Sequence, residues 1–354
     1  MSHYITIPIN ENGIVLDTDM NSVVVEAMSA RPFNFSDVYL YSHGWANDAA
    51  RALDEYNRFS VDFSKVVHLI AALNPAVFRN GPAESLGVGI HWPSQITESP
   101  QSALNNLELL TFYTMEHRAD SVGRNAVYSI LRLMLQSRMH EGAAPRLNLI
   151  GHSFGCKVVL AALQDLQTDI ADGTIAVPAG TVFNVVLLEP ATDNDHLDPG
   201  DIYGDVYKLQ DLRTLITTSQ KDEALVTWFH LAGTAANIVH KPLAGVADAV
   251  LGGGPRALGA VGPTLATQNA FGGARNVVVD HNFVATDMRD IHERLIVADL
   301  TPIHTWRLTQ NPPLYSGGGF GGSHSDINFE QLYQLVCGFL FGIENQTQIP
   351  VPLL

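Results

Sequence analysis

The chain has 354 residues, of which 46% are hydrophobic and 16% are charged, so it can bury a large core. Its 36 acidic and 20 basic residues give a formal net charge of −16, and the Lys and Arg residues form no cluster. Binding to a phosphate backbone needs a basic surface stripe, so this charge distribution excludes a nucleic-acid partner. The sequence predicts one domain over residues 1–354.

The N-terminal segment has neither the basic start nor the apolar core of a secretory signal peptide. We therefore expect a cytoplasmic protein, and export by a specialised secretion system, which needs no such signal, is the alternative. The longest apolar candidate for a membrane span, residues 229–255, is interrupted by charged and histidine residues, which predicts no transmembrane segment. Cys156 and Cys337 are the two cysteines, and we expect both to be buried free thiols.

Strands and helices alternate along the chain. We expect strands at residues 37–42, 86–92, 146–150, 182–188, 213–218 and 295–297, with helical regions at 48–73, 102–139 and 329–341. This alternation predicts right-handed crossovers and a mainly parallel sheet with helices on both faces. Ligands of such sheets bind beyond the carboxyl ends of the strands.

The segment Gly151-His152-Ser153-Phe154-Gly155 connects an apolar strand to a helix with an apolar face. Gly-x-Ser-x-Gly in this context predicts a nucleophile elbow, in which a serine occupies a strained turn. Small residues on both sides are needed because strand and helix pass closely. Ser153 is therefore the candidate nucleophile.

These residues resemble the α/β-hydrolase superfamily. Within it, the chain is similar to bacterial esterases and lipases that have a Gly-His-Ser-Phe-Gly elbow and a Trp-Pro-Ser after an earlier strand, here Trp92-Pro93-Ser94. The resemblance covers residues 37 to 225 and resumes near 320, whereas 231 to 320 match no family pattern. It implies the α/β-hydrolase fold and cleavage of carboxylic esters through an acyl-enzyme on Ser153.

A serine hydroxyl is a weak nucleophile, so it needs a histidine to take its proton and a carboxylate to orient that histidine. In the superfamily the order along the chain is serine, acid, histidine. Asp222 follows the strand at 213–218 and resembles the acid loop of such hydrolases, although an aspartate here also fits a helix N-cap. Glu189, just after the preceding strand, is the second candidate for the acid.

The base is expected near the C-terminus. His324 lies in a glycine-rich loop before the last helix and resembles the histidine loop of related esterases and phospholipases. His304, after the strand at 295–297, and His281 are the alternatives. With His324 as the base, activity should rise with pH, because the neutral imidazole accepts the serine proton.

An oxyanion intermediate needs two N–H donors, which we assign to Phe154 and to Trp45, although Trp45 also fits a wall of the site. We expect no cofactor, because the glycine-rich stretch 317–322 follows two prolines rather than a buried strand. We also expect no metal, because the Asp193-Asn194-Asp195-His196 group lacks the ligand spacing of common metal sites.

Residues 94–142 and 231–275 are candidate cap or lid insertions, because both are rich in apolar residues and the second is bounded by glycines. A small-residue helix buried in the core is the alternative for 231–275. Caps of this kind would favour small-molecule or lipid esters. Two other functions stay open: a phospholipase-type antibacterial effector, and a non-catalytic binding protein on a hydrolase fold. The sequence specifies neither the acyl chain nor the oligomeric state.

Overall fold

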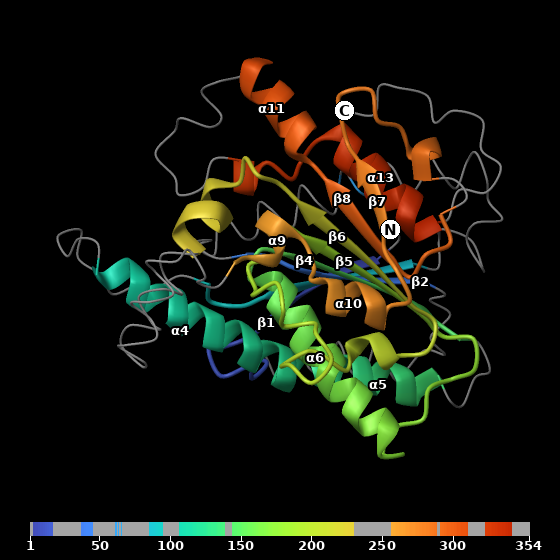
Figure 1. Cartoon of the computed structure of the whole chain (residues 1–354). Helices are drawn as coiled ribbons and strands as arrows, with labels where there is room; N and C mark the ends of the chain where they lie inside the picture. Colours follow the sequence, from blue (N-terminus) through green and yellow to red (C-terminus); the bar gives the residue numbers. More distant parts are fainter. Residues whose placement is uncertain are drawn as a thin grey trace.

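A computed structural model describes residues 3–16, 37–44, 61, 63, 65, 85–94, 106–138, 144–229, 256–288, 291–310 and 323–341. Its centre is one eight-stranded sheet in the order β1-β3-β2-β4-β5-β6-β8-β7, in which all neighbouring strands are parallel (Figure 1). The strands are β1 (His3–Pro8), β2 (Asp37–Ser42), β3 (Ser85–His91), β4 (Arg146–His152), β5 (Val182–Leu188), β6 (Leu212–Thr218), β7 (Arg275–Val278) and β8 (Leu295–Asp299).

The helical elements lie between these strands along the chain and after β8, the last of them. They are α4 (Asn106–Val122), η4 (Gly123–Val127), α5 (Tyr128–Arg138), α6 (Gly155–Ala171), η5 (Val206–Lys208), η6 (Ala224–Phe229), α9 (Leu258–Val261), α10 (Leu265–Ala270), η7 (Ala285–Met288), α11 (Thr301–Gln310), η8 (Ser323–Ser325) and α13 (Glu330–Phe341). Among the described residues, none of these helices combines the length and apolar character that crossing a bilayer requires.

The predicted parallel sheet is confirmed. β2 and β5 have the expected bounds. β4, β6 and β8 differ from expectation by one or two residues at one end, and β3 is shifted by one residue at both ends. The edge strands β1 and β7 were not predicted. The chain leaves β2 toward β3 on one side and returns to β4 on the other, so the strand order reverses between β2 and β4. Such a reversal opens a crevice at the carboxyl ends of the two strands.

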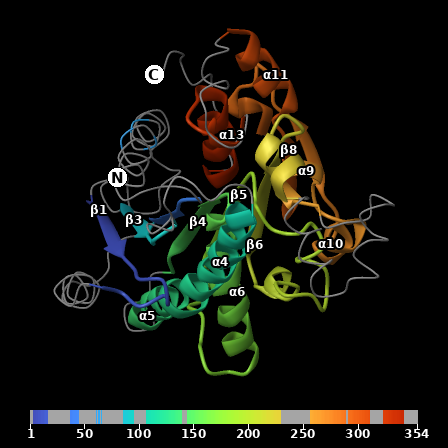
Figure 2. The same cartoon turned by 90° about the vertical axis from the view of Figure 1, so that its left-hand side faces the viewer.

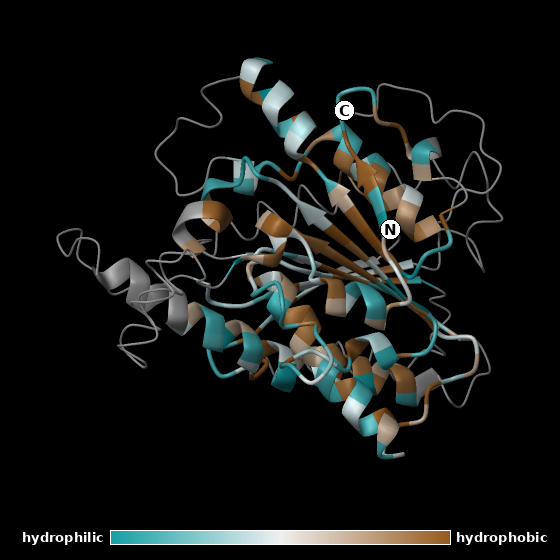
Figure 3. Ribbon diagram, in the orientation of Figure 1, coloured by the Kyte–Doolittle hydropathy of each residue, from teal (hydrophilic) through white to brown (hydrophobic). Residues whose placement is uncertain are grey.

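Helices cover both faces of the sheet (Figures 1 and 2). Side chains of β4 alternate between the faces: Leu147 and Leu149 belong to the core under α4, α5 and α6, whereas Ile150 belongs to the core under α13. Figure 3 shows largely hydrophobic strands at the centre and, around them, helices that carry both hydrophobic and hydrophilic residues. This layering fixes the carboxyl end of β4 near the middle of the sheet.

The described parts of the two candidate caps lie against the sheet layers. In 94–142, helices α4 and α5 contact α6, and Met115, Ala119 and Val122 are buried in the core beneath it. In 231–275, helix α9 contacts β6. The remainder of both segments and most of the predicted helix at 48–73 lie outside the described residues, so the caps stay a prediction.

Candidate active site

Ser153 occupies the sharp turn between β4 and α6. Its φ of 55° lies in the left-handed region, which residues other than glycine rarely adopt. Its backbone N–H donates to the Leu188 carbonyl at 3.0 Å, and its carbonyl accepts the Cys156 N–H at 3.1 Å. These bonds tie the turn to β5 and to α6, so the strained conformation is held from two sides.

The glycines that flank Ser153 have the steric role that the sequence predicted. A Cβ atom at Gly151 would lie 2.6 Å from the Cys156 nitrogen, and one at Gly155 would collide with the carbonyl oxygens of Ser42 and His43. Strand, turn and helix therefore approach one another too closely for any larger residue. Cys156 is buried in this same contact and, like Cys337, is a free thiol.

Three of the predicted site residues lie in one hydrogen-bonded line. His324 Nε2 is 2.8 Å from Ser153 Oγ, and His324 Nδ1 is 2.6 Å from Asp222 Oδ2. Because an ionised carboxylate can only accept, Nδ1–H donates to Asp222 and Nε2 is left to accept the serine hydroxyl proton. Asp222 Oδ1 accepts the Leu225 N–H at 2.9 Å, which is the N-cap arrangement considered from the sequence.

The turn that carries His324 is anchored by three other contacts. The His152 Nε2–H donates to the His324 carbonyl at 2.9 Å. Arg307 donates two hydrogen bonds to the Asp326 carboxylate, at 2.5 and 2.7 Å. The Ser323 N–H donates to the Lys221 carbonyl. His152 belongs to the elbow motif that precedes α6, and its ring also holds the turn that carries His324.

The turn after β2 lies directly beside Ser153. A Cβ atom at Gly44 would be 2.7 Å from Ser153 Cβ. The buried His43 ring stacks on Trp92, with ring centroids 5.3 Å apart and an interplanar angle of 11°. The Trp-Pro-Ser segment after β3 thus supports the turn that precedes Trp45, and Trp45 itself lies outside the described residues.

Phe154, the other predicted oxyanion donor, is the N-cap residue of α6, with φ −64° and ψ −20°. It lies at the positive end of a 17-residue helix. Backbone N–H groups at such a helix start suit a developing negative charge. The oxyanion role of Phe154 and Trp45 stays a prediction.

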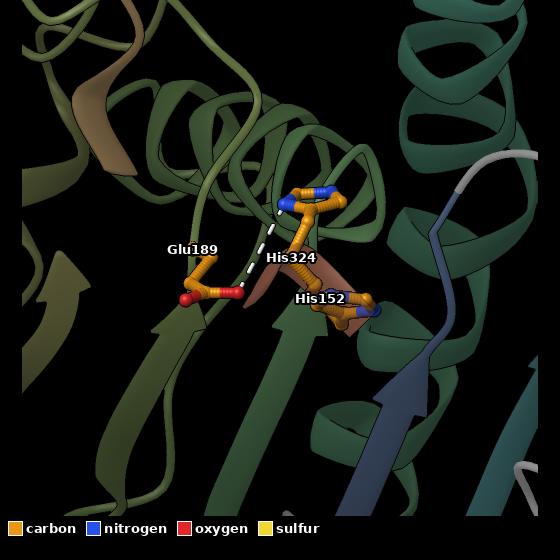
Figure 4. Close-up of side chains that lie close together, drawn as sticks. All are labelled: His152, Glu189 and His324. Atoms are coloured by element: carbon orange, nitrogen blue, oxygen red, sulfur yellow. Dashed lines mark hydrogen bonds and ion pairs between the residues drawn. The ribbon is translucent and has the colours of Figure 1, made fainter. Parts of the chain in front are cut away.

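Glu189 and His304, the alternatives considered for the acid and the base, are fully buried beside this line. Glu189 Oε2 is 3.9 Å from His324 Nδ1, farther than Asp222, and Glu189 Oε1 is 3.5 Å from His304 Nδ1. His304 Nδ1 lies 2.8 Å from Ser219 Oγ. In Figure 4 the Glu189 carboxylate, at the end of one strand, points toward the His324 ring, and His152 lies at the end of the neighbouring strand.

Burial changes the pKa values of His304 and Glu189. It lowers the pKa of His304 from 6.5 to about 4, so this imidazole is neutral near neutral pH. Burial, and after it the charges of Asp222 and Asp326, raise the pKa of Glu189 well above its ordinary 4.5. The buried surroundings of His324 thus hold one neutral imidazole and one carboxyl that favours its protonated form.

Among the described residues, two groups of side chains bring potential metal-ligand atoms within 4.8 Å of one another. The first is His152, Glu189 and His324, where a metal would compete with the hydrogen bonds that His324 makes. The second is Asp193, Asp195 and His196, where His196 is already hydrogen-bonded to Thr192 and paired with Asp193. Neither group has the His-Glu-x-x-His or Cys/His spacing of a common metal site.

A cavity of about 850 Å³ lies on the α9 side of the sheet, at the ends of β6, β7 and β8. Its described lining residues are Thr218, Gln220, Leu225, Val226, Arg256, Ala257, Ala260, Val261, Gly262, Asn276, Val277, Val278, Val297 and Asp299. Ser153, Asp222 and His324 are not among them. The cavity is therefore a neighbour of the acid loop rather than the space in front of Ser153.

The sequence profile of a family described as "Alpha/beta hydrolase of unknown function (DUF900)" matches residues 33–238, more than half of the chain. The chain belongs to this α/β-hydrolase family. The predicted superfamily and fold are thereby confirmed. Comparison with curated proteins and with solved structures gave no significant match.

The α/β-hydrolase match includes Ser153, Glu189 and Asp222, whereas His304 and His324 lie beyond its end. Its N-terminal limit falls just before β2, so the edge strand β1 also lies outside it. The family description names a fold and a broad hydrolase class without a substrate. The identity of the scissile bond must therefore be argued from the chemistry of the site.

Proposed function

We propose that the protein is a serine hydrolase that cleaves carboxylic esters through an acyl-enzyme on Ser153. The observation that carries this proposal is the hydrogen-bonded line from Ser153 through His324 to Asp222. It supplies a nucleophile, a base and a group that fixes the tautomer of the base, which acyl transfer from an ester requires. The strained elbow at the crevice between β2 and β4 supports the same proposal.

The reaction follows from the direction of these hydrogen bonds. Ser153 Oγ forms a bond to the ester carbonyl carbon as His324 Nε2 takes the hydroxyl proton, and Asp222 stabilises the resulting imidazolium. The backbone N–H groups of Phe154 and Trp45 stabilise the oxyanion. The tetrahedral intermediate then collapses: the bond between the carbonyl carbon and the alcohol oxygen breaks, and the imidazolium gives its proton to that oxygen. Water then attacks the acyl-enzyme carbonyl while His324 again takes the proton. The bond to Ser153 Oγ breaks, and the carboxylic acid is released.

The complete set of three side chains favours catalysis over a binding role, because a binding protein on this fold needs no aligned base and acid. A phospholipase-type effector uses the same chemistry on a lipid ester. The substrate class is tested with p-nitrophenyl esters of increasing chain length and, in parallel, phospholipid vesicles. We expect ester turnover that Ser153→Ala reduces by about 10³-fold or more. Turnover that persists in this variant, or cleavage of amides without esters, contradicts the proposal.

A further inference from the structure

Two carboxyl groups lie beside the same imidazole nitrogen, although the proposed mechanism uses only one. Asp222 Oδ2 is 2.6 Å and Glu189 Oε2 is 3.9 Å from His324 Nδ1. Both carboxyl side chains have zero solvent exposure. The other oxygen of Glu189 faces His304 Nδ1 at 3.5 Å, so this carboxyl lies between two imidazole rings.

The surroundings of the two carboxyls differ. Asp222 accepts hydrogen bonds from the Leu225 N–H and from His324, which stabilise a negative charge. Within the described part of the chain, neither carboxyl oxygen of Glu189 accepts a hydrogen bond. A buried carboxylate without donors and next to a second carboxylate is costly, so the Glu189 carboxyl favours its protonated form.

The backbone commits Glu189 to this position. Glu189 follows the last residue of β5 with a φ of 44°, in the left-handed region. Its N–H donates to Thr217 Oγ1 at 2.9 Å, and a Cβ atom at Gly259 would lie 2.6 Å from the Glu189 carbonyl carbon. The backbone is strained at a buried acid whose carboxyl oxygens accept no hydrogen bond from the described residues, which points to a role in function rather than in stability.

We propose that Glu189 is a reserve acid for His324. It is a positioning residue that holds a proton while Asp222 orients the histidine, and it accepts the His324 N–H when the charge of Asp222 is removed. When Glu189 replaces Asp222 as the hydrogen-bond acceptor, the Glu189 O–H bond breaks and its proton goes to solvent. The carboxylate oxygen then closes from 3.9 Å to hydrogen-bonding distance by side-chain rotation. The inference rests on the proposed function, because it concerns the same histidine.

The role of Glu189 predicts a pH dependence with a definite sign. Ionisation of its carboxyl is opposed by burial and, in order, by the charges of Asp222 and Asp326. In the described part of the chain, three further titratable groups lie near this carboxyl: the Cys156 thiol and the His304 and His324 rings. Asp222→Asn removes the stronger of these two charge effects, whereas Glu189 stays buried. In this variant, activity should therefore rise as pH increases and Glu189 loses its proton.

The experiment compares kcat/KM for an ester between about pH 6 and about pH 9 in Asp222→Asn, in Asp222→Asn/Glu189→Gln and in Asp222→Asn/Glu330→Gln. We expect Asp222→Asn to keep a residual activity. Between the two pH limits its kcat/KM should increase by a factor about tenfold larger than the factor for the wild type. Glu189→Gln should remove this rise and lower the residual activity at the upper pH by about tenfold or more. Glu330, a half-buried glutamate at the start of α13, is the matched control, and its variant should keep the rise.

A folded Asp222→Asn variant without the rise, or a rise that survives Glu189→Gln, overturns the proposal. A second measurement does not depend on turnover: titration of ¹³C-labelled glutamate carboxyls by NMR in Ser153→Ala, with Glu189 assigned from the signal that Glu189→Gln removes. We expect its carboxyl to stay protonated where the exposed glutamates are ionised, and joint ionisation with them contradicts the inference. If the wild type cleaves no ester, the proposed function fails, whereas this titration still decides where the proton is.

Discussion

At the residue scale, the two histidines of the site have opposite environments. The His324 side chain is 12% exposed and reaches Ser153 Oγ, whereas the His304 side chain is fully buried and contacts Ser219. Burial lowers the pKa of His304 to about 4, which makes it a poor proton acceptor at neutral pH. The geometry therefore favours His324 as the base.

This difference predicts the kinetics of two alanine variants. His324→Ala should abolish the burst of acyl-enzyme and lower turnover by several orders of magnitude, because Ser153 loses its proton acceptor. His304→Ala should retain the burst, since His304 contacts neither Ser153 nor Asp222 in the described hydrogen bonds. Stopped-flow measurement of p-nitrophenol release separates the two. Loss of the burst in His304→Ala, with retention in His324→Ala, would reverse the assignment.

The buried acid predicts a stability effect. The folded state raises the pKa of Glu189 above the ordinary 4.5. Above that pH the unfolded chain loses a proton that the folded chain keeps, so Glu189 destabilises the fold increasingly as pH rises toward its raised pKa. Glu189→Gln should therefore raise Tm relative to the wild type, by about 2 °C or more at about pH 8, with a smaller gap near pH 4.5. Calorimetry measures this Tm difference at each pH, with Glu330→Gln as the control. A Tm difference that does not change with pH would refute the prediction.

At the scale of elements, the site depends on close contact between the start of α6 and the end of β2. Gly155 is the first residue of α6, and a side chain there would collide with the carbonyls of Ser42 and His43. The Phe154 N-cap and Ser153 immediately precede it. A change at this contact should therefore disturb catalysis and stability together.

Gly155→Ala tests this contact. Alanine favours a helix by about 1 kcal/mol over glycine, so a gain in stability is expected if propensity dominates. We expect instead a loss of about 1–3 kcal/mol, because the new Cβ must displace the backbone of β2. Urea unfolding measures the change. Thr168→Ala, at an exposed position of the same helix, is the control that should not be destabilised. A stabilised Gly155→Ala would show that the contact can relax.

At the scale of the whole molecule, the features that the sequence predicted are those with a local signal. Alternating strands and helices predicted the parallel sheet, and Gly-x-Ser-x-Gly between a strand and a helix predicted the elbow. Asp222 and His324 were predicted from short segments that resemble known loops, and the structure brings both to Ser153.

What the sequence did not predict depends on contacts between distant segments. The His152 bond to the His324 carbonyl joins residues 172 positions apart. Glu189 meets His304 only because β5 ends and α11 begins at the same edge of the sheet. The edge strands β1 and β7 were missed. Each pairs on one side only, and β7 has 4 residues. Contacts of this kind follow from the assembled sheet, and no short motif encodes them.

The central claim is that Ser153 is an activated nucleophile, and covalent labelling with a fluorophosphonate tests it most directly. Ser153 Oγ should displace fluoride from phosphorus while His324 takes the hydroxyl proton, which leaves a stable phosphonylated serine. We predict one adduct per chain by intact mass, located at Ser153 by peptide mapping and missing from folded Ser153→Ala. A wild-type chain that does not react, or a Ser153→Ala variant that reacts at the same rate, would contradict this account.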